Sequence, residues 1–385
     1  MNFKVNCVHC HTVFSFKKPF PPIYMWTASI ALGMGAGILW TSQGRFLTKC
    51  GTSETKKKNG GIFWAFLQGG ALLGNIIVFI AFKDGIEANS RILAFTIFTI
   101  LTSIGVASFK LLKHVEEEQE DVETLSLKKS GEENEDESEK SPMEVFKNSL
   151  ALLTNKKMMI MMVVFIYSGI SQVFVFGIHG TCVRTSSFGE TIFGDKILSD
   201  QLMAVTGLFI AIGSMTAGVV DSYLGGFSTQ VKFRVAMIVQ IAAYFICVGN
   251  FGDDAAKGKK QAEVKDGAVL ELNGMYWEEQ SSLGAAMLSS LLVAFGDGLM
   301  NTQIFFYLTT NFTGKNAAAA FSIFKSIQSF SVAGANWYAS KLALGNQLGL
   351  AVVFSLASVL LYAFSGFNPT PTEPTKTADE NQEST

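Results

Sequence analysis

Two ionisable residues, Asp297 and Lys325, stand inside long apolar stretches that contain AFGDGLMNTQ and FSIFKSIQS. A charged side chain at the centre of a membrane helix costs about 2.5–3.5 kcal/mol on insertion scales, so each residue needs a partner or a function. One hypothesis is that they pair across two neighbouring antiparallel helices and line a central cavity with Asn301, Gln303 and Gln328. The alternative is a structural pair that locks the two helices and binds no solute.

Four further polar side chains lie in otherwise apolar stretches: Gln43, Gln68, Asn75 and Gln172. Polar side chains can hydrogen-bond between helices in lipid, so helix packing is the simpler expectation and contact with a solute the alternative. His179 could sense protons, because the charge of histidine changes near neutral pH. A hydrogen-bonded packing role is the simpler expectation for it too.

The residues that could bind a cofactor or a metal form no convincing pattern. Residues 7–11 read CVHCH, which matches the C-x-x-C-H pattern of covalent haem attachment, but no cytochrome-like segment surrounds this short match. A zinc site would need a second pair of ligands. The sequence also lacks the motifs of serine hydrolases, zinc proteases and phosphate-binding loops. We therefore expect no enzyme, no cofactor and no metal.

The composition is that of a membrane protein. Of the 385 residues, 49% are hydrophobic and 16% are charged, whereas a soluble domain carries about 25% charged residues. The net charge of -2 excludes a strongly basic nucleic-acid binder. Five scattered cysteines indicate no disulfide framework.

The apolar stretches are long enough to cross a bilayer as helices, which takes about 20 residues each. We predict an all-α, multi-pass bundle with nine transmembrane helices. The predicted spans are 23–41, 61–82, 92–110, 158–179, 202–224, 234–251, 283–309, 317–340 and 347–366.

Polar segments divide these spans into groups. The stretch 111–149 is strongly acidic and is expected to be a disordered cytoplasmic loop, because it cannot bury a core. Lys and Arg are more numerous in the loops on this side, which places the C terminus in the cytoplasm by the positive-inside rule. The predicted units are an N-terminal segment 1–22, three helices in 23–110, the loop 111–149, six helices in 150–366 and a disordered tail 367–385.

A sequence pattern occurs twice, six spans apart. GMGAGILWTSQGRFLT at 33–48 resembles GDGLMNTQIFFYLT at 296–309. A six-helix period is typical of transporters built from two parallel halves of six helices. On that interpretation, 150–366 is a whole half and 23–110 contains only the last three helices of the other. The alternative is a chance likeness between two Gly-rich helix ends.

Several motifs carry a family resemblance: the repeat just described, GIFWAFLQGGALLGN at 61–75, YSGISQVFVFGIHGTC at 167–182 and AFSIFKSIQS at 320–329. Together they resemble the unc-93-like (uncoordinated-93) family of the major facilitator superfamily, in its major-facilitator-domain-containing branch. The resemblance runs from about residue 25 to 366 and implies that the nine spans are helices four to twelve of a major-facilitator-like bundle, without the first three. Asp221 in GVVDSYLGG looks like the second-half counterpart of the superfamily's signature loop.

The resemblance also implies a function. Family members regulate potassium channels or accompany other membrane proteins, so we expect a non-enzymatic regulatory or partner subunit. The alternative is a secondary transporter of a small solute or ion by alternating access. The expected partners are the lipid bilayer and an ion channel, another membrane protein, or a small solute or ion, with no nucleic acid. The expected location is the plasma membrane or an endomembrane.

Overall fold

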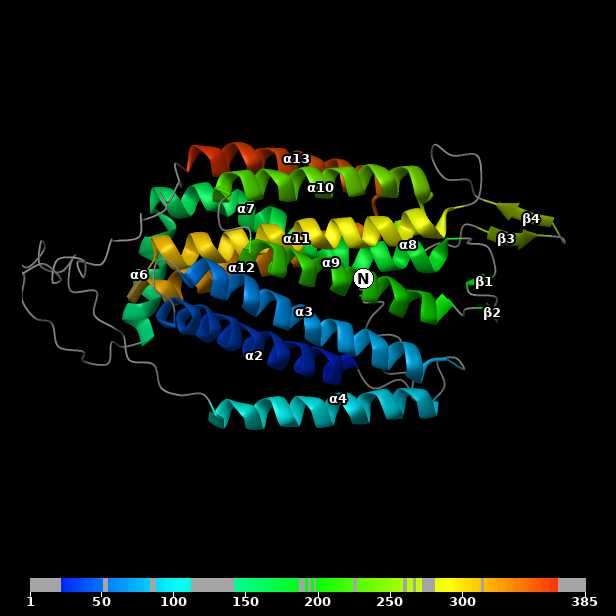
Figure 1. Ribbon diagram of the computed structural model, residues 1–385, viewed down its shortest axis with the longest axis horizontal. Coiled ribbons are helices and arrows are strands. Elements are labelled where there is room, and N and C mark those ends of the chain that lie inside the picture. Colours follow the sequence, from blue (N-terminus) through cyan, green and yellow to red (C-terminus); the bar gives the residue numbers. More distant parts are fainter. Residues whose placement is uncertain are drawn as a thin grey trace, which may run out of the picture.

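Each of the nine predicted spans coincides with a long helix in the computed structural model (Figure 1). The structure describes residues 22–50, 55–83, 88–111, 142–186, 191–192, 195–196, 199–223, 227–258, 262–265, 268–271, 281–312 and 315–365. The predicted disordered tail, most of the acidic loop and the CVHCH motif lie outside these residues.

The helices form two groups along the chain, separated by the segment between Leu111 and Pro142. The first group is α2 (Pro22–Lys49), α3 (Thr55–Ala81) and α4 (Ala88–Ser108), which a 3-10 turn extends to Leu111. The second group is α6 (Pro142–Leu153), α7 (Lys156–Val173), the π-helical segment η2 (Phe174–Ile178), α8 (His179–Thr185), α9 (Ser199–Tyr223), α10 (Thr229–Asn250), the 3-10 turn η3 (Ala255–Lys257), α11 (Leu283–Asn311), α12 (Lys315–Ala339) and α13 (Leu344–Phe364).

Two small hairpins are the only strands in the described residues. β1 (Thr191–Ile192) pairs with β2 (Asp195–Lys196), and β3 (Ala262–Lys265) pairs with β4 (Ala268–Glu271), both antiparallel. They project from one end of the helical bundle and form no part of its core (Figure 1).

Helix α6 begins inside the stretch that was predicted to be the acidic loop, 111–149. Residues 142–149 were assigned to the disordered loop, but Pro142–Leu153 is helical. Proline is well suited to the first position of a helix, and the segment PMEVFKNSLALL has apolar residues at helical spacing. The acidic stretch therefore ends before residue 142.

Eight helical segments of the described chain are long and apolar enough to span a membrane, with α7, η2 and α8 forming one continuous span. The ninth predicted span, α12, has the length but not the apolarity, because it carries Lys325, Gln328 and several serines. It packs against α7 and α2, and Gln328 is buried there, whereas Ser326, Ser329 and Asn336 are exposed. The all-α, multi-pass membrane fold is confirmed.

The core lies among the helices of the second group. α11 packs against both α9 and α10, and α7 packs against α12 and α13. In the most apolar stretch of α11, 61% of the residues are buried, whereas none are buried in that of α2 and 6% in that of α4. α4 lies at the edge of the bundle opposite α13 (Figure 1). The first group is therefore peripheral and exposes its apolar side chains.

Local capping explains several helix boundaries. The side chain of Asn155 accepts a hydrogen bond from the Lys157 amide at the start of α7 (2.9 Å). Ser228 and Ser282 accept from the backbone in the same way at the starts of α10 and α11. Such caps satisfy amide groups that have no partner within the helix. The predicted start of α11 at residue 283 follows directly from Ser282.

Helices α3 and α9 approach each other closely at two glycines. A Cβ atom added to Gly218 would lie 2.6 Å from the Gly61 carbonyl oxygen, and one added to Gly61 would lie 2.7 Å from the Gly218 carbonyl oxygen. Nearby, the Trp64 indole donates a hydrogen bond to Ser214 Oγ (3.0 Å). Small residues allow such contact in lipid, where no hydrophobic force draws helices together. This contact joins the first group of helices to the second.

Adjacent glycines on α3 provide a test of this contact. We expect Gly61→Ala to destabilise the protein by about 1–3 kcal/mol, because the added methyl group is forced into the backbone of α9. Gly60→Ala is the matched control, since a Cβ there has no neighbour within 4 Å. Thermal unfolding of the purified variants in detergent measures both effects. Equal melting temperatures for the two variants would contradict the close approach.

The orientation in the membrane can be tested by glycosylation. The sequon Asn311-Phe312-Thr313 begins at the end of α11 that lies beside the start of α7, where Lys157 Nζ donates to Asn311 Oδ1 (2.9 Å). The proposed orientation puts this end in the cytoplasm, so Asn311 stays unmodified. Met275→Thr creates a new sequon that begins at Asn273, in the segment between α10 and α11 that precedes the other end of α11.

We expect a glycosidase-sensitive mass shift for the Met275→Thr variant expressed in mammalian cells and none for the unaltered chain. The variant supplies the positive signal that the unaltered chain lacks. A shift in the unaltered chain would mean that the orientation is reversed.

Candidate functional site

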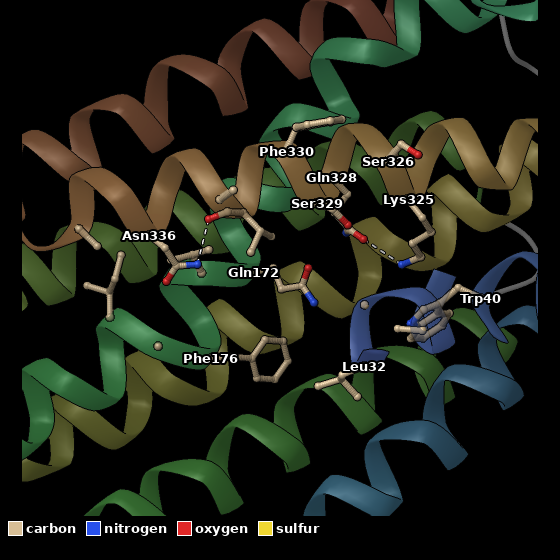
Figure 2. Close-up of a pocket in the computed structure, with 18 of the residues that line it drawn as sticks. Leu32, Trp40, Gln172, Phe176, Lys325, Ser326, Gln328, Ser329, Phe330 and Asn336 are labelled. Atoms are coloured by element: carbon tan, nitrogen blue, oxygen red, sulfur yellow. Dashed lines mark hydrogen bonds between the residues drawn. The ribbon is translucent and has the colours of Figure 1, made fainter. Parts of the chain in front are cut away.

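A cavity of about 1250 Å³ lies between α2, the α7–η2–α8 span and α12 (Figure 2). Trp40 and Leu32 of α2, Gln172 of α7, Phe176 of η2 and several side chains of α12 surround it (Figure 2). The π-helical turn η2 forms part of its wall, and such turns within α-helices occur frequently at functional sites. This cavity is the candidate functional site.

Lys325 of α12 is one of the two described charged residues that line the cavity, with Lys257 of η3. Its ammonium group donates a hydrogen bond to Gln328 Oε1 (2.9 Å) and lies 4.2 Å from the ring centroid of Trp40 (Figure 2). It also lies 4.6 Å from the ring centroid of Phe324 and 5.6 Å from that of Phe305. Cation–π contacts of this kind contribute up to about 2 kcal/mol when they are shielded from water. Aromatic rings and one neutral amide therefore hold the charge.

Gln328 is held in one orientation by a second hydrogen bond. Its Nε2 donates to Ser168 Oγ on α7 (3.1 Å), which leaves its oxygen facing Lys325. α7 and α12 come close enough for this bond because Gly169 has no side chain: a Cβ there would lie 2.5 Å from the Gln328 carbonyl oxygen. The wall of the cavity around Lys325 is thus pre-organised.

Asp297 of α11 belongs to a different network. Ser171 Oγ donates to its Oδ1 (2.7 Å), and Asn301 Nδ2 donates to its Oδ2 (3.1 Å). Gln240 Nε2 on α10 donates in turn to Ser171 Oγ (3.0 Å), and Tyr167 donates to Gln240 Oε1. Every donor in this series points towards the carboxylate, so α7, α10 and α11 are joined through it.

The predicted contact between Asp297 and Lys325 does not form. No ion pair within 4 Å joins these two described side chains. The five residues that the sequence analysis grouped therefore separate: Lys325 and Gln328 line the cavity, whereas Asp297, Asn301 and Gln303 do not. Gln172 lines the cavity with Lys325 instead (Figure 2).

Gln303 takes part in a third polar cluster, around Asp221. Lys232 Nζ of α10 lies 2.7 Å from Asp221 Oδ1, and the two side chains are 2% and 1% exposed. Gln303 Nε2 donates to the same oxygen (2.9 Å). Asp221 was expected from the family resemblance, whereas Lys232 was not predicted. The signal was present: opposite charges stand at the ends of two successive spans across a short Gly-containing loop.

The remaining predicted polar residues have no common site. Asn75 donates to the Ala71 carbonyl oxygen (2.9 Å) and packs over Gly207 of α9, as expected for a packing role. Gln68 is buried on α3, and the amide nitrogen and oxygen of Gln43 are buried without a hydrogen-bond partner. His179 is buried beside two hydroxyls: its Nε2 shares a hydrogen bond with Ser289 Oγ (2.9 Å).

Trp40 is a lining residue of the candidate site that was not predicted from the sequence. Its position in GMGAGILWTSQG reveals nothing about Lys325, because the two residues lie on α2 and α12. The described residues also contain no cluster of histidine, cysteine or carboxylate side chains suited to a metal ion. The arrangement around the cavity is suited to binding and positioning a ligand.

Two double-mutant cycles can separate these polar contacts. Lys232→Met alone should cost about 3–5 kcal/mol, because it leaves the buried Asp221 carboxylate without its counter-charge. Adding Asp221→Asn should restore much of that loss. For Asp297→Asn and Lys325→Gln, which do not touch, we expect a coupling of at most about 1 kcal/mol.

The free energy of unfolding of each single and double variant, measured in detergent, gives both couplings, and the first cycle serves as the control for the second. A larger coupling for Asp297 and Lys325 than for Asp221 and Lys232 would mean that the former pair is in direct contact.

Comparison with known proteins assigns the chain to a family. Residues 6–363 match the family model described as ion channel regulatory protein UNC-93. The chain is 26% identical over 352 residues to the UNC93-like protein MFSD11 of Xenopus tropicalis. This alignment covers 89% of this chain and 75% of that protein. It is 28% identical over 352 residues to the Xenopus laevis protein of the same name, with the same coverage. It is 24% identical over 330 residues to UNC93-like protein 3 of Arabidopsis thaliana, covering 80% of this chain and 61% of that protein. A match over nearly the whole chain, on a multi-pass bundle with this order of helices, places the protein in the UNC-93 family.

Proposed function

We propose that this chain is a non-enzymatic membrane subunit that regulates or accompanies another membrane protein, and that a potassium channel is the first partner to test. The match of residues 6–363 to a family described as ion channel regulatory proteins is the observation that carries this proposal. The resemblance of the sequence to regulators of potassium channels supports the choice of channel.

Helix α4 supplies a surface that fits such a role. Within the described chain it packs chiefly on α3, and Ala94 is its one buried residue. Ile100 and Ile104 are 54% and 61% exposed, and a Cβ added at Gly105 would have no neighbour within 4 Å. Apolar side chains beside a small residue allow a second membrane helix to approach closely. This surface lies on the opposite edge of the bundle from α13 (Figure 1).

The cavity between α2, α7 and α12 favours a second candidate, a secondary transporter of a small solute or ion. Alternating access requires two bundles that rock around a central site. We propose 23–110 and 150–366 as these two units, with the α3–α9 and α2–α12 contacts as the joint between them. The first unit has three helices and the second six, so regulation remains the primary proposal.

The proposed orientation places the C-terminal tail in the cytoplasm.

The test is to co-express the chain with a panel of potassium channels and to record whole-cell currents. We expect the current of at least one channel to change when the chain is present. Gly105→Leu should remove that change, because the larger side chain blocks close approach to α4. Gly349→Leu on α13 is the matched control, since a Cβ at that position also has no neighbour within 4 Å.

Two outcomes would contradict the regulatory role. The first is unchanged current for every channel, with the chain present at the cell surface. The second is saturable uptake of a solute by proteoliposomes that contain only this chain and that lose uptake with Lys325→Gln, a change in the lining of the cavity. The second outcome would establish the transporter alternative.

A further inference from the structure

The described residues that line the cavity carry positive charge and no negative charge. Lys325 and Lys257 are the charged side chains among them, and neither aspartate nor glutamate is present. Lys257 is already paired, since its ammonium group lies 2.8 Å from Asp254 Oδ1. Lys325 is therefore the lining cation whose contacts include no carboxylate.

The contacts of Lys325 leave its charge available to the cavity. In the described structure its hydrogen bond goes to a neutral amide oxygen, that of Gln328, and its other close contacts are ring faces. An ammonium group has three donors, so this hydrogen bond uses one of them. Cation–π contacts stabilise the charge without cancelling it. An anion in the cavity could accept the remaining hydrogen bonds.

Asp297 does not serve as that anion. Both of its carboxylate oxygens already accept hydrogen bonds, from Ser171 and Asn301, and it does not line the cavity. A ligand could contact Lys325 without displacing any of these bonds.

We propose that this cavity binds an amphipathic organic anion, a molecule with one negatively charged head and an apolar body. The head lies against Lys325 and Trp40, where the ammonium group supplies charge and hydrogen bonds. The body lies along Leu32 and Phe176, which face the cavity from α2 and η2, with Gln172 between the two regions (Figure 2).

The size and lining of the cavity fit such a ligand. Its volume of about 1250 Å³ is above the roughly 300–1,000 Å³ of most small-molecule sites, which leaves room for an extended apolar body. Apolar walls with a few convergent polar groups are typical of such sites. Near the charged end, Thr41 and Ser322 share a hydrogen bond between their hydroxyls (3.4 Å), which adds polar atoms beside Lys325.

The inference concerns binding and goes beyond the proposed function. A regulatory subunit could use the site to sense a metabolite or a lipid, and a transporter could use it to carry one. The binding site and the channel partner are tested by different variants, on α12 and α4, so one proposal can fail while the other holds.

The experiment is photo-crosslinking of the full chain in nanodiscs of neutral phospholipid. Three probes share one diazirine-bearing dodecyl chain and differ in the head: a carboxylate, an alcohol and a trimethylammonium group. At neutral pH we expect saturable labelling by the carboxylate that maps to residues 32–41 and 172–181, with much weaker labelling by the other two. Because this comparison uses the unaltered chain, it does not depend on whether any variant folds.

Variants then assign the charge to one residue. Lys325→Gln should weaken carboxylate labelling by about tenfold or more, the effect expected from losing about 1.4 kcal/mol of binding energy. Lys325→Arg should retain most of it. Lys341→Gln is the matched control, because Lys341 stacks on Trp337 of the preceding helix (3.5 Å from its ring centroid) but does not line the cavity.

Competition identifies the source of the anionic head. Loss of labelling on adding unlabelled dodecanoate supports a free amphipathic anion, and loss only in nanodiscs that contain an anionic phospholipid supports a lipid headgroup. Equal labelling by all three probes, preference for the trimethylammonium probe, or labelling that Lys325→Gln leaves unchanged would each overturn the proposal.

Discussion

The carboxylate of Asp297 lies inside the bundle, and the arrangement of the second group of helices depends on the hydrogen bonds that this carboxylate accepts. Lipid supplies no hydrogen bonds, so polar groups within it must find partners in the protein. Here Tyr167, Gln240 and Ser171 form a series of donors that ends on Asp297 Oδ1, and Asn301 donates to Oδ2. Because these donors come from α7, α10 and α11, they fix the three helices relative to one another.

The first group of helices obeys a different constraint. α2, α3 and α4 bury few side chains and meet the second group mainly where α3 packs on α9 and α2 packs on α12. The repeated sequence pattern illustrates the contrast. Gly296 and Gly298 of α11 pack against neighbouring helices, whereas a Cβ at Gly35 or Gly37 of α2 would have no neighbour within 4 Å in the described chain. Similar local sequences are therefore densely packed in the second group of helices and exposed in the first.

The cavity is formed by both groups of helices. In the UNC-93 family fold described here, Lys325 is held by Trp40 from the first group and by Gln328 and Phe324 from α12. A ligand against Lys325 would contact both groups of helices at once. Such a ligand would bear on the contact between α2 and α12, whereas α3 is held mainly by its contact with α9.

The sequence by itself determined the membrane class, the family and the positions of the helices, because apolar runs of about 20 residues and caps such as Ser282 are local signals. It also marked Asp297, Lys325 and Gln328 as residues that need partners. Only the tertiary structure decided which partners they have. Lys325 meets Trp40 across 285 residues of chain, Asp297 meets Ser171 across 126, and Gln303 meets Asp221 across 82. Helices that are apolar on all sides contain no periodic signal for which face meets which neighbour, so these pairings depend on how the whole bundle packs.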